Sequence, residues 1–516
     1  MTQDEYNTRA PHEGMSPGRY VATRFSSLKP PMHNVPNPIK LLRMLNSQQW
    51  AFFFVAFVAW TWDAFDFFSV SLSVTSLART FDKSKTDITW GITLVLMFRS
   101  VGSIIFGIAS DRYGRKWPFV INNLLFIVLE LVMNTDDIYQ GTGFCQTYQQ
   151  FLACRALFGI AMGGLYGNAA ATALEDCPEE ARGLMSGILQ QGYAFGYLLC
   201  AAFARGLVDT TSHDWRPLFW FGACPPVLFI IWRLMLPETQ AYQERQRLRA
   251  EAGADGKGKV FIKEGKVALK HHWLLLVYLV LLMAGFNFMS HGSQDLYPTM
   301  LENQLNFSKN RVTVTQVVAN LGAMTGGTVV GFCSQSVGRR ISIIVCCIVG
   351  GALLYPYTFV RDSSIIAAAF FQQFCVQGAW GVIPIHLMEL SPGAFRTFVV
   401  GTSYQLGNLV SSASSTIEAR LGERFPLPDN AEGETRYDYG KVICIFMACV
   451  YVYVIVLTFI GPENLRGKFD VAHDSDAKEA MGTRAMDQAG RHGRSMDEEN
   501  VLRDSTEKPE VAHMRD

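Results

Sequence analysis

The chain has 516 residues, of which 49% are hydrophobic and only 17% are charged. Its 45 basic side chains balance 45 acidic ones, so no charge bias points to a nucleic acid or to an acidic partner. The apolar content favours a membrane-embedded protein with polar tails. Eleven cysteines at irregular spacing predict neither a disulfide framework nor a zinc site.

Twelve segments are apolar enough to cross a bilayer, which takes roughly 20 mostly apolar residues. We place them at residues 50–78, 88–108, 117–133, 151–173, 183–203, 217–236, 272–297, 312–332, 341–359, 365–387, 397–416 and 441–460. The polar N-terminal segment carries no cleavable signal sequence, so we expect the first span to direct insertion.

A hydrophilic stretch from 240 to 271 divides the spans into six and six and carries eight basic residues. Basic loops lie on the cytoplasmic side of a membrane, so we expect this loop and both termini to be cytoplasmic. The predicted domains are a tail at 1–49, a six-helix bundle at 50–239, the loop at 240–271, a second bundle at 272–464, and a tail at 465–516. The second tail is charged and poor in apolar residues, so we expect it to be disordered.

The two halves repeat one another. Ten residues from Gly107 to Lys116 recur 224 residues later, from Gly331 to Arg340. Glu175-x-x-Pro178-x-x-x-Arg182 recurs 214 residues later, and Pro237-Glu238 recurs 225 residues later. Longer loops at 134–150 and 420–440 account for the changes in spacing. The pattern predicts an all-α polytopic membrane protein built from two parallel six-helix repeats.

The repeated motifs are predicted to form a charge latch on one membrane face. Arginine and lysine at helix ends can bind last-turn carbonyls and pair with acids, which stabilises one access state. The predicted latch residues are Asp111, Arg112, Arg115, Lys116, Glu175, Arg182, Glu389 and Arg396. The second copy has Gln335 and Ser336 in place of the acid and the first arginine, so we expect it to latch more weakly. We expect the first copy to stabilise the outward-open state.

These motifs carry a family resemblance. Gly-x-x-x-Asp-Arg-x-Gly-Arg-Lys after the second span resembles the signature loop of the major facilitator superfamily. Arg155-x-x-x-Gly159-x-x-x-Gly163-Gly164 resembles the fourth span of the same family. The resemblance covers residues 50–464 and implies that family's twelve-helix fold and transport by alternating access. The sequence carries no catalytic constellation, no metal cluster and no Walker-type phosphate loop, so we predict a transporter and not an enzyme, without a cofactor.

The seventh predicted span is dense in polar side chains. Asn287, His291 and Gln294 lie on one helix face, and Ser290 and Asp295 flank them. Polar groups at bilayer depth are costly and normally face a cavity, although a polar seam between helices is an alternative. The segment resembles the span-seven motif of the fungal lactate/pyruvate:proton permeases, which are the Jen family within the sialate:proton symporter group.

Arg99 lies near the middle of the second span, and its planar fork suits a carboxylate. The resemblance also implies a substrate-interacting arginine in this span. The alternative is a permanent ion pair with Asp63 or Asp66 of the first span, and both can hold in different states. Asp63, Asp66, His291 and Asp295 are the candidate proton carriers, because buried carboxylates and histidine can exchange a proton near neutral pH.

Two glutamines each lie nine residues after a motif arginine, Gln191 after Arg182 and Gln405 after Arg396. The resemblance implies that Gln405 lies near the substrate, and Gln191 is a further candidate. Glu130 of the third span is expected at the rim.

The sequence predicts a proton-coupled symporter that imports a short monocarboxylate such as lactate or pyruvate across the plasma membrane. The predicted substrate ligands are Arg99, Asn287, Ser290, His291, Gln294, Gln405 and Gln191. Dicarboxylates such as succinate or malate, and sialic acid, are alternative substrates, and a carboxylate sensor without transport is the alternative of another class. The expected partners are the substrate, a proton and the lipid bilayer, with no nucleic acid, and a monomer is expected to suffice.

Overall fold

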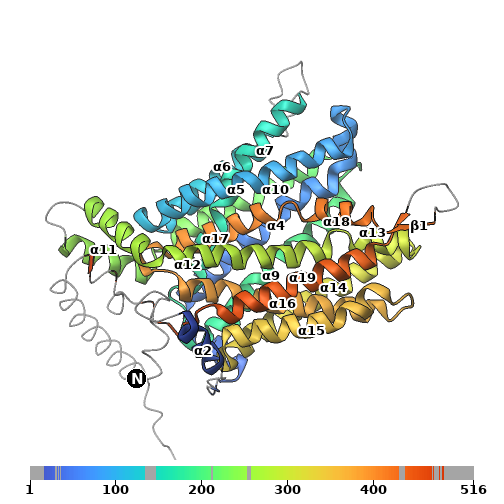
Figure 1. The fold of residues 1–516 in the computed structure, drawn as a ribbon. Coiled ribbons are helices and arrows are strands. Elements are labelled where there is room, and N and C mark those ends of the chain that lie inside the picture. The colour runs from blue at the N-terminus through green and yellow to red at the C-terminus, as the bar shows by residue number, and fades with distance from the viewer. Residues whose placement is uncertain are drawn as a thin grey trace, which may run out of the picture.

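The computed structural model describes residues 17–28, 32, 34, 36–133, 147–210, 213–252, 257–428, 436–467, 469, 476 and 479–480. Most of this part of the chain is helical. It contains a single pair of two-residue strands, β1 (Pro426–Leu427) and β2 (Arg436–Tyr437), which is antiparallel. Figure 1 shows long helices running side by side through the body of the molecule. The predicted all-α class is therefore confirmed.

The first half has six membrane-crossing helices preceded by two short ones. The short helices are α2 (Pro17–Ser27) and α3 (Pro38–Met44). The six are α4 (Ser47–Phe81), α5 (Lys85–Tyr113), α6 (Lys116–Met133), α7 (Tyr148–Gly163) continued by α8 (Leu165–Leu174), α9 (Arg182–Leu207) after the turn η1 (Glu179–Ala181), and α10 (Arg216–Met235). Asn46 and Ser84 begin α4 and α5 with capping boxes. In each box the side chain of the first residue accepts a hydrogen bond from the backbone N–H three residues later, and the side chain of that later residue accepts one from the backbone N–H of the first.

The second half repeats this order. Its helices are α12 (Lys257–Gln294), α14 (Lys309–Val337), α15 (Arg339–Phe359), α16 (Ile365–Leu390), α17 (Arg396–Ser411) continued by α18 (Ser414–Gly422), and α19 (Tyr439–Ile460). The turns α13 (Tyr297–Thr299), η2 (Met300–Gln304) and η3 (Gly393–Phe395) connect them. Among the described residues, nine helical stretches are by themselves long and apolar enough to span a membrane. Together with α6, α9 and α17 they make two sets of six.

The described residues of the central hydrophilic stretch, 240–252 and 257–271, are helical, whereas the sequence predicted a loop there. The stretch forms α11 (Gln240–Ala252) and the first turns of α12. Its residues are good helix formers. Arg245 and Arg249, one turn apart, both bind Glu264, at 3.1 Å and 2.7 Å. We call the end of the bundle that carries α11 the loop face and the opposite end, which carries α18 and β1, the far face (Figure 1). Most of the tail predicted to be disordered, 465–516, lies outside the described residues.

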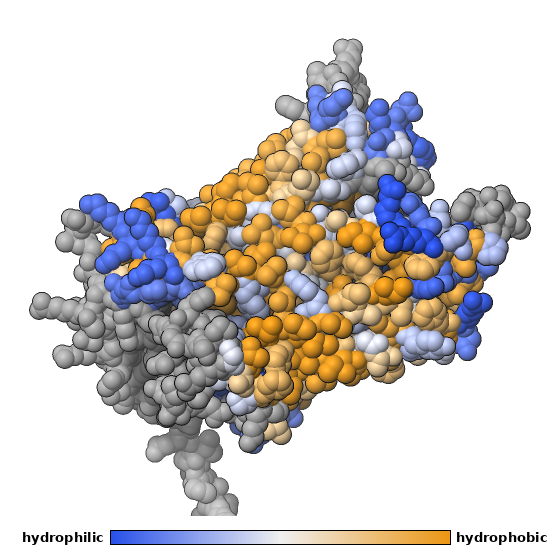
Figure 2. Space-filling view, viewed as in Figure 1, coloured by the Kyte–Doolittle hydropathy of each residue, from blue (hydrophilic) through white to orange (hydrophobic). Residues whose placement is uncertain are grey.

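Apolar side chains cover the outside of the bundle. Met235, Leu228 and Val452 are 79%, 65% and 62% exposed. Figure 2 shows this apolar surface across the body, with hydrophilic clusters at the two ends. Polar and charged side chains are buried between the helices instead. This inside-out arrangement suits a lipid surround, because lipid tails do not penalise exposed apolar groups.

Small residues bring the two halves into close contact. α9 packs against α14, and α5 and α8 pack against α17. A Cβ atom added to Gly183 would lie 2.7 Å from the carbonyl oxygen of Gly331, and one added to Gly187 would lie 2.4 Å from that of Gly327. The backbones of α9 and α14 therefore touch directly, which only glycine permits.

Both halves turn from their second to their third span in the same way. Gly114 and Gly338 end α5 and α14 with φ of 99° and 109°. Glu238 then accepts a hydrogen bond from the backbone N–H of Lys116 at 3.0 Å, and Glu463 accepts one from that of Arg340 at 3.3 Å. These acids explain the repeated Pro-Glu pairs, because a carboxylate stabilises the start of the helix that follows.

Candidate transport site and loop-face latch

Arg99 of α5 and Asp63 of α4 form a buried ion pair. Both residues are only 1% exposed, and Arg99 Nη2 lies 3.2 Å from Asp63 Oδ2. The guanidinium also lies 4.9 Å from the Phe67 ring centre. In the described part of the chain, Arg99 Nε and Asp63 Oδ1 make no hydrogen bond. The same Nη2 also donates to Met162 Sδ at 3.1 Å, so Asp63 meets only one nitrogen of the guanidinium, whose planar fork can bind a carboxylate at two points.

Asp66 lies one turn along α4 and faces a different set of charges. It is fully buried, and neither carboxylate oxygen has a hydrogen-bond partner among the described residues. The charges of Glu130 and Arg155 act on it. Glu130 is fully buried, so its predicted position at the rim is wrong: α6 turns residue 130 toward the inside of the bundle. The buried charged side chains of the first half thus include Asp63, Asp66, Arg99, Glu130 and Arg155.

The polar motif of span seven divides between two environments. Asn287 donates to the carbonyl of Met283 in its own helix at 2.8 Å. Ser290 accepts a hydrogen bond from Trp380 Nε1 at 2.7 Å, and Gln294 Nε2 donates to Gln373 Oε1 at 2.9 Å. These last two contacts join α12 to α16, so part of the motif forms the polar helix seam that the sequence left open as an alternative.

His291 and Asp295 form the accessible part of that motif. His291 Nδ1 lies 3.1 Å from Asp295 Oδ2, and the two side chains are 24% and 33% exposed. His291 lies on the last turn of α12, Asp295 directly follows that helix, and the two side chains bind each other. The charges of Asp295, Arg99 and Asp63 all act on Tyr193 of α9. Tyr193 therefore lies close enough to the ion pair of the first half and to Asp295 of the second half for the charges of both to act on it.

The two candidate glutamines have different surroundings. Gln405 is fully buried in α17, and its backbone carbonyl accepts a hydrogen bond from Ser100 of α5 at 3.1 Å. Its side-chain Nε2 has no hydrogen-bond partner in the described structure. Gln191 instead donates to Gly187 O at 3.0 Å and packs against Gly327 of α14. Gln405 therefore has an unused donor in a helix that contacts α5, whereas Gln191 fills the contact between the halves.

An aromatic cluster at the centre was missed by the sequence analysis. Tyr166 stacks on Tyr404 at 4.1 Å, and Trp60 lies 4.9 Å from Tyr166. Trp380 lies 5.9 Å from Tyr404. Among the described residues, the Trp60 Nε1 and the Tyr166 hydroxyl make no hydrogen bond. The internal repeat could have revealed part of this cluster, because Tyr166 and Trp380 are aromatic residues at the same 214-residue offset that relates Glu175 to Glu389.

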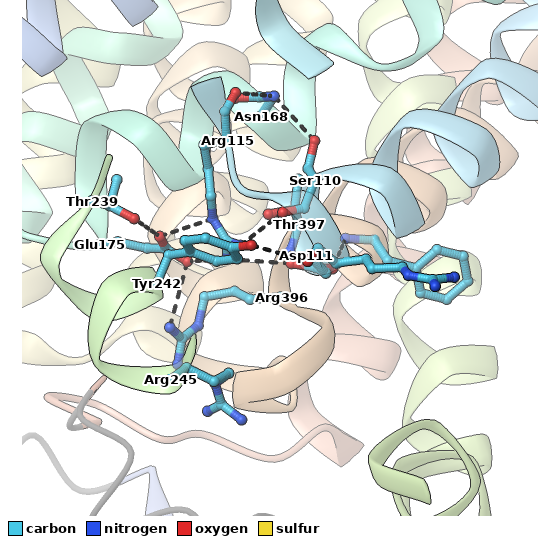
Figure 3. Close-up of polar contacts among 12 residues, drawn as sticks. Ser110, Asp111, Arg115, Asn168, Glu175, Thr239, Tyr242, Arg245, Arg396 and Thr397 are labelled. Atoms are coloured by element: carbon cyan, nitrogen blue, oxygen red, sulfur yellow. Dashed lines mark hydrogen bonds and ion pairs between the residues drawn. The ribbon is translucent and has the colours of Figure 1, made fainter. Parts of the chain in front are cut away.

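Most residues of the predicted latch lie at the loop face, where Arg115 and Glu175 contact each other (Figure 3). Arg115 donates twice to Glu175, at 2.6 Å and 3.1 Å. Thr239 donates to Glu175 at 3.1 Å, and Arg396 of the second half lies 3.7 Å away. Burial alone raises the pKa of the Glu175 carboxyl, but Arg115 and Arg396 and the hydrogen bonds bring it below its usual value.

Asp111 ties this centre to the other half. It lies 3.2 Å from Arg115 Nη2 and accepts hydrogen bonds from the backbone N–H groups of Thr397 and Phe398, at 3.2 Å and 2.8 Å. These N–H groups belong to the first turn of α17, where a negative charge is stabilised by the helix dipole. The first copy of the latch therefore holds the two halves together at the loop face.

The second copy keeps the arginine–glutamate pair and lacks the acid that corresponds to Asp111. Arg339 donates twice to Glu389, both at 3.0 Å. Gln335 stands where the first copy has Asp111. It accepts from Arg339 at 2.7 Å and donates to the carbonyl of Glu179 in the first half at 2.9 Å. One neutral hydrogen bond thus replaces the two charge-assisted ones.

The remaining latch residues differ in role. Lys116 Nζ donates to the last carbonyls of α10, at 2.7 Å and 2.9 Å, as helix-end lysines do. Arg182 donates to Gly467 O at 2.8 Å and packs 3.8 Å from the Phe469 ring, which also lies 4.2 Å from Arg396. Arg112 is exposed and lies over the ring of Tyr113, so its side chain lies outside the latch.

No group of three or more histidine, cysteine or acidic side chains in the described ranges is arranged to hold a metal ion. The cysteines of the described chain are free thiols.

Comparison with known proteins gives one family. Residues 44–470 match the family model described as sugar (and other) transporter. The chain is 42% identical over 466 residues to a carboxylic acid transporter protein homolog of Saccharomyces cerevisiae, covering 86% of this chain and 74% of that protein. It is 26% identical to a cis,cis-muconate transport protein of Acinetobacter baylyi over 71% of this chain and 86% of that protein. It is also 26% identical to the sialic acid transporter NanX of Escherichia coli over 81% and 95%.

Solved structures show the same fold. The proton:xylose symporter XylE bound to 6-bromo-6-deoxy-D-glucose superposes with a TM-score of 0.64 at 17% identity, over 82% of this chain and 98% of that one. The human organic anion transporter MFSD10 superposes with a TM-score of 0.56 at 13% identity, over 80% of this chain and all of that one.

Proposed function

Since this chain belongs to the sugar (and other) transporter family of the major facilitator superfamily, we propose that it is a proton-coupled symporter of short monocarboxylates. The three relatives named above carry carboxylic acids in their names, which supports a carboxylate as the substrate. Lactate and pyruvate are the proposed substrates, and import occurs by alternating access.

The observation that carries this proposal is the buried Arg99–Asp63 pair. Arg99 binds Asp63 through one nitrogen only, and both keep an unused polar atom in the described structure. A substrate carboxylate can take the place of Asp63 on the guanidinium, since a planar fork binds carboxylates at two points. Gln405 Nε2 and the hydroxyl of Tyr166 can donate to the remaining substrate oxygens.

Proton coupling follows from the charge of the substrate. An anion moving against an inside-negative potential costs about 2.3 kcal/mol per 100 mV, and one accompanying proton makes the step electroneutral. His291 and Asp295 are the proposed proton site, because an anion arriving beside His291 favours its protonated form. Asp63 and Asp66 are the competing site, since substrate binding to Arg99 frees Asp63 to accept a proton.

The proposed orientation places the loop face in the cytoplasm of the cell, with both termini inside and the protein in the plasma membrane. The basic residues of 240–271 support it through the positive-inside rule. With the latch closed at that face, the conformation faces outward. The proposed domains are the bundles 50–239 and 272–464 joined by the cytoplasmic segment 240–271.

Reconstitution into liposomes tests the proposal. We expect uptake of labelled lactate that rises with an inward proton gradient and is competed by pyruvate more strongly than by succinate, malate or sialic acid. Stronger competition by succinate or sialic acid would assign one of those acids instead. Lactate binding without lactate uptake, both with and without the proton gradient, would identify a sensor and reject transport.

A further inference from the structure

Glu418 is a buried acid for which the proposed mechanism has no use. It lies on α18, near the far face, and is 0% exposed. Both of its carboxylate oxygens are buried without a hydrogen-bond partner in the described structure. Glu423, which directly follows this short helix, is by contrast 53% exposed and lies 3.4 Å from Arg420. An ionised carboxylate without partners is strongly unfavourable in such a place, whereas the neutral acid is tolerated.

The surroundings of Glu418 connect it to the polar motif of span seven. α18 packs against α12 and α19. A Cβ atom on Gly292 would lie 3.1 Å from Glu418 Oε1 and 2.5 Å from the Phe446 ring of α19. The absence of a side chain at Gly292 therefore provides the space for the carboxyl group. Gly292 directly follows His291, so the acid packs on the turn that carries the His291–Asp295 pair.

Three ionisable groups face Glu418 from the helices around it. His291 lies on the last turn of α12 and Asp295 directly follows that helix, and the charge of Asp295 acts on Glu418. Tyr357 of α15 is electrostatically coupled to Glu418 as well, and its hydroxyl donates to the carbonyl of Ser293 at 2.6 Å. At this point α19 contributes the apolar ring of Phe446. Burial and the Asp295 charge both favour the protonated acid, and none of these neighbours supplies a cation in contact with it.

We propose that Glu418 is a proton-binding carboxyl of the transport cycle, loaded while the loop face is closed and discharged in the opposite access state. Loading forms an O–H bond between a carboxylate oxygen and a proton from water. Discharge breaks that bond and leaves the electron pair on the oxygen. Hydration of the α12–α18 contact and a changed position of Asp295 remove the two influences that hold the proton. The inference rests on the proposed proton coupling and adds a site to it.

The test uses the full chain in liposomes, with labelled lactate as the probe. Lactate–lactate exchange needs no net proton movement, whereas accumulation under a pH gradient does. We expect Glu418→Gln, which keeps the shape of the neutral acid, to exchange lactate at the wild-type rate. It should lose the ~tenfold accumulation that one proton supplies per pH unit. Glu423→Gln, at an exposed acid just after α18, should keep both activities.

Each outcome has a defined reading. Wild-type protein that does not respond to the pH gradient would reject the proposed coupling and not the role of Glu418 alone. A coupled wild type with an equally coupled Glu418→Gln variant would overturn the inference. If Glu418→Gln fails to exchange, Glu418→Asp decides: a displaced pH profile of accumulation supports the role, and an unchanged profile overturns it.

Discussion

The two halves of the molecule share a backbone plan and differ in the charge of their interiors. Positions 63 and 66 of the first half are aspartates, and the repeat-related positions 287 and 290 are asparagine and serine. Arg99 corresponds to Ala323 at the same offset. The acids of the second half, Asp295 and Glu418, lie at positions without an acidic counterpart in the first half.

This difference suits the two halves to different proposed tasks, the binding of an anion in the first half and the exchange of a proton in the second. The first half places a fixed cation in the interior, which suits recognition of an anion. The second half supplies neutral hydrogen-bonding groups and acids that can change their charge. The two copies of the predicted latch also differ in charge. Asp111 makes two charge-assisted hydrogen bonds to the other half, whereas Gln335 makes one neutral hydrogen bond to it.

Arg99→Lys tests the cation of the first half and should have the largest effect. Lysine keeps the charge but loses the fork, and disrupting a buried charged contact costs about 2–5 kcal/mol. We expect lactate uptake to fall by at least ~30-fold with surface expression unchanged. Arg79→Lys, at an exposed ion pair with Asp209, is the matched control. Near-normal uptake by Arg99→Lys would remove its proposed role.

Neutralising the acids of each half in turn tests where the proton is carried. If span seven carries it, His291→Gln and Asp295→Asn should exchange lactate without accumulating it, and Asp66→Asn should still accumulate it. The measured quantity is the accumulation ratio under an imposed pH gradient, with a loss of about tenfold per pH unit. The reverse pattern would assign the proton to the first half and limit span seven to substrate binding.

Alanine at the two latch positions compares the copies directly. Asp111→Ala removes two charge-assisted hydrogen bonds, each worth about 1.5–3 kcal/mol, whereas Gln335→Ala removes a neutral one worth about 1 kcal/mol. We expect labelling of an Ala394→Cys reporter in the loop-face pocket to rise by ~100-fold or more for the first and only ~fivefold for the second. Equal labelling would show that the copies latch equally well.

The smallest predicted effect concerns pH at the loop face. Burial raises the pKa of Asp176 to about 6, above the usual value near 3.9. A raised pKa in the folded state stabilises the protein below the unfolded pKa, and this contribution is lost as the pH rises through the folded pKa. Relative to Asp176→Asn, the wild type should therefore lose a few degrees at most of its unfolding temperature between about pH 4 and pH 6. A thermal-unfolding series in detergent measures this, with the exposed Asp82→Asn as control.

The sequence predicted the order of the spans and the pairing of Arg115 with Glu175, because both rest on local signals. Apolar runs of sufficient length mark helices, and the repeat of Glu175 as Glu389 marks matching turns. Glu130 was misplaced because its position within an apolar run does not determine which side of a helix faces the bundle. The Tyr166–Tyr404 stack was missed because it joins helices of opposite halves, and pairing at that separation leaves no pattern within one span.

The direct contact between Gly183 and Gly331 has a consequence for motion. A surface made of backbone alone has no rotamers to order when the halves meet and none to free when they part. The energy barrier for moving one half against the other at this contact is then set by the desolvation of carbonyl groups and not by the repacking of side chains. A larger residue at either position would have to repack at each step of the motion. The added energy barriers would slow each turnover even where the end states keep their relative free energies.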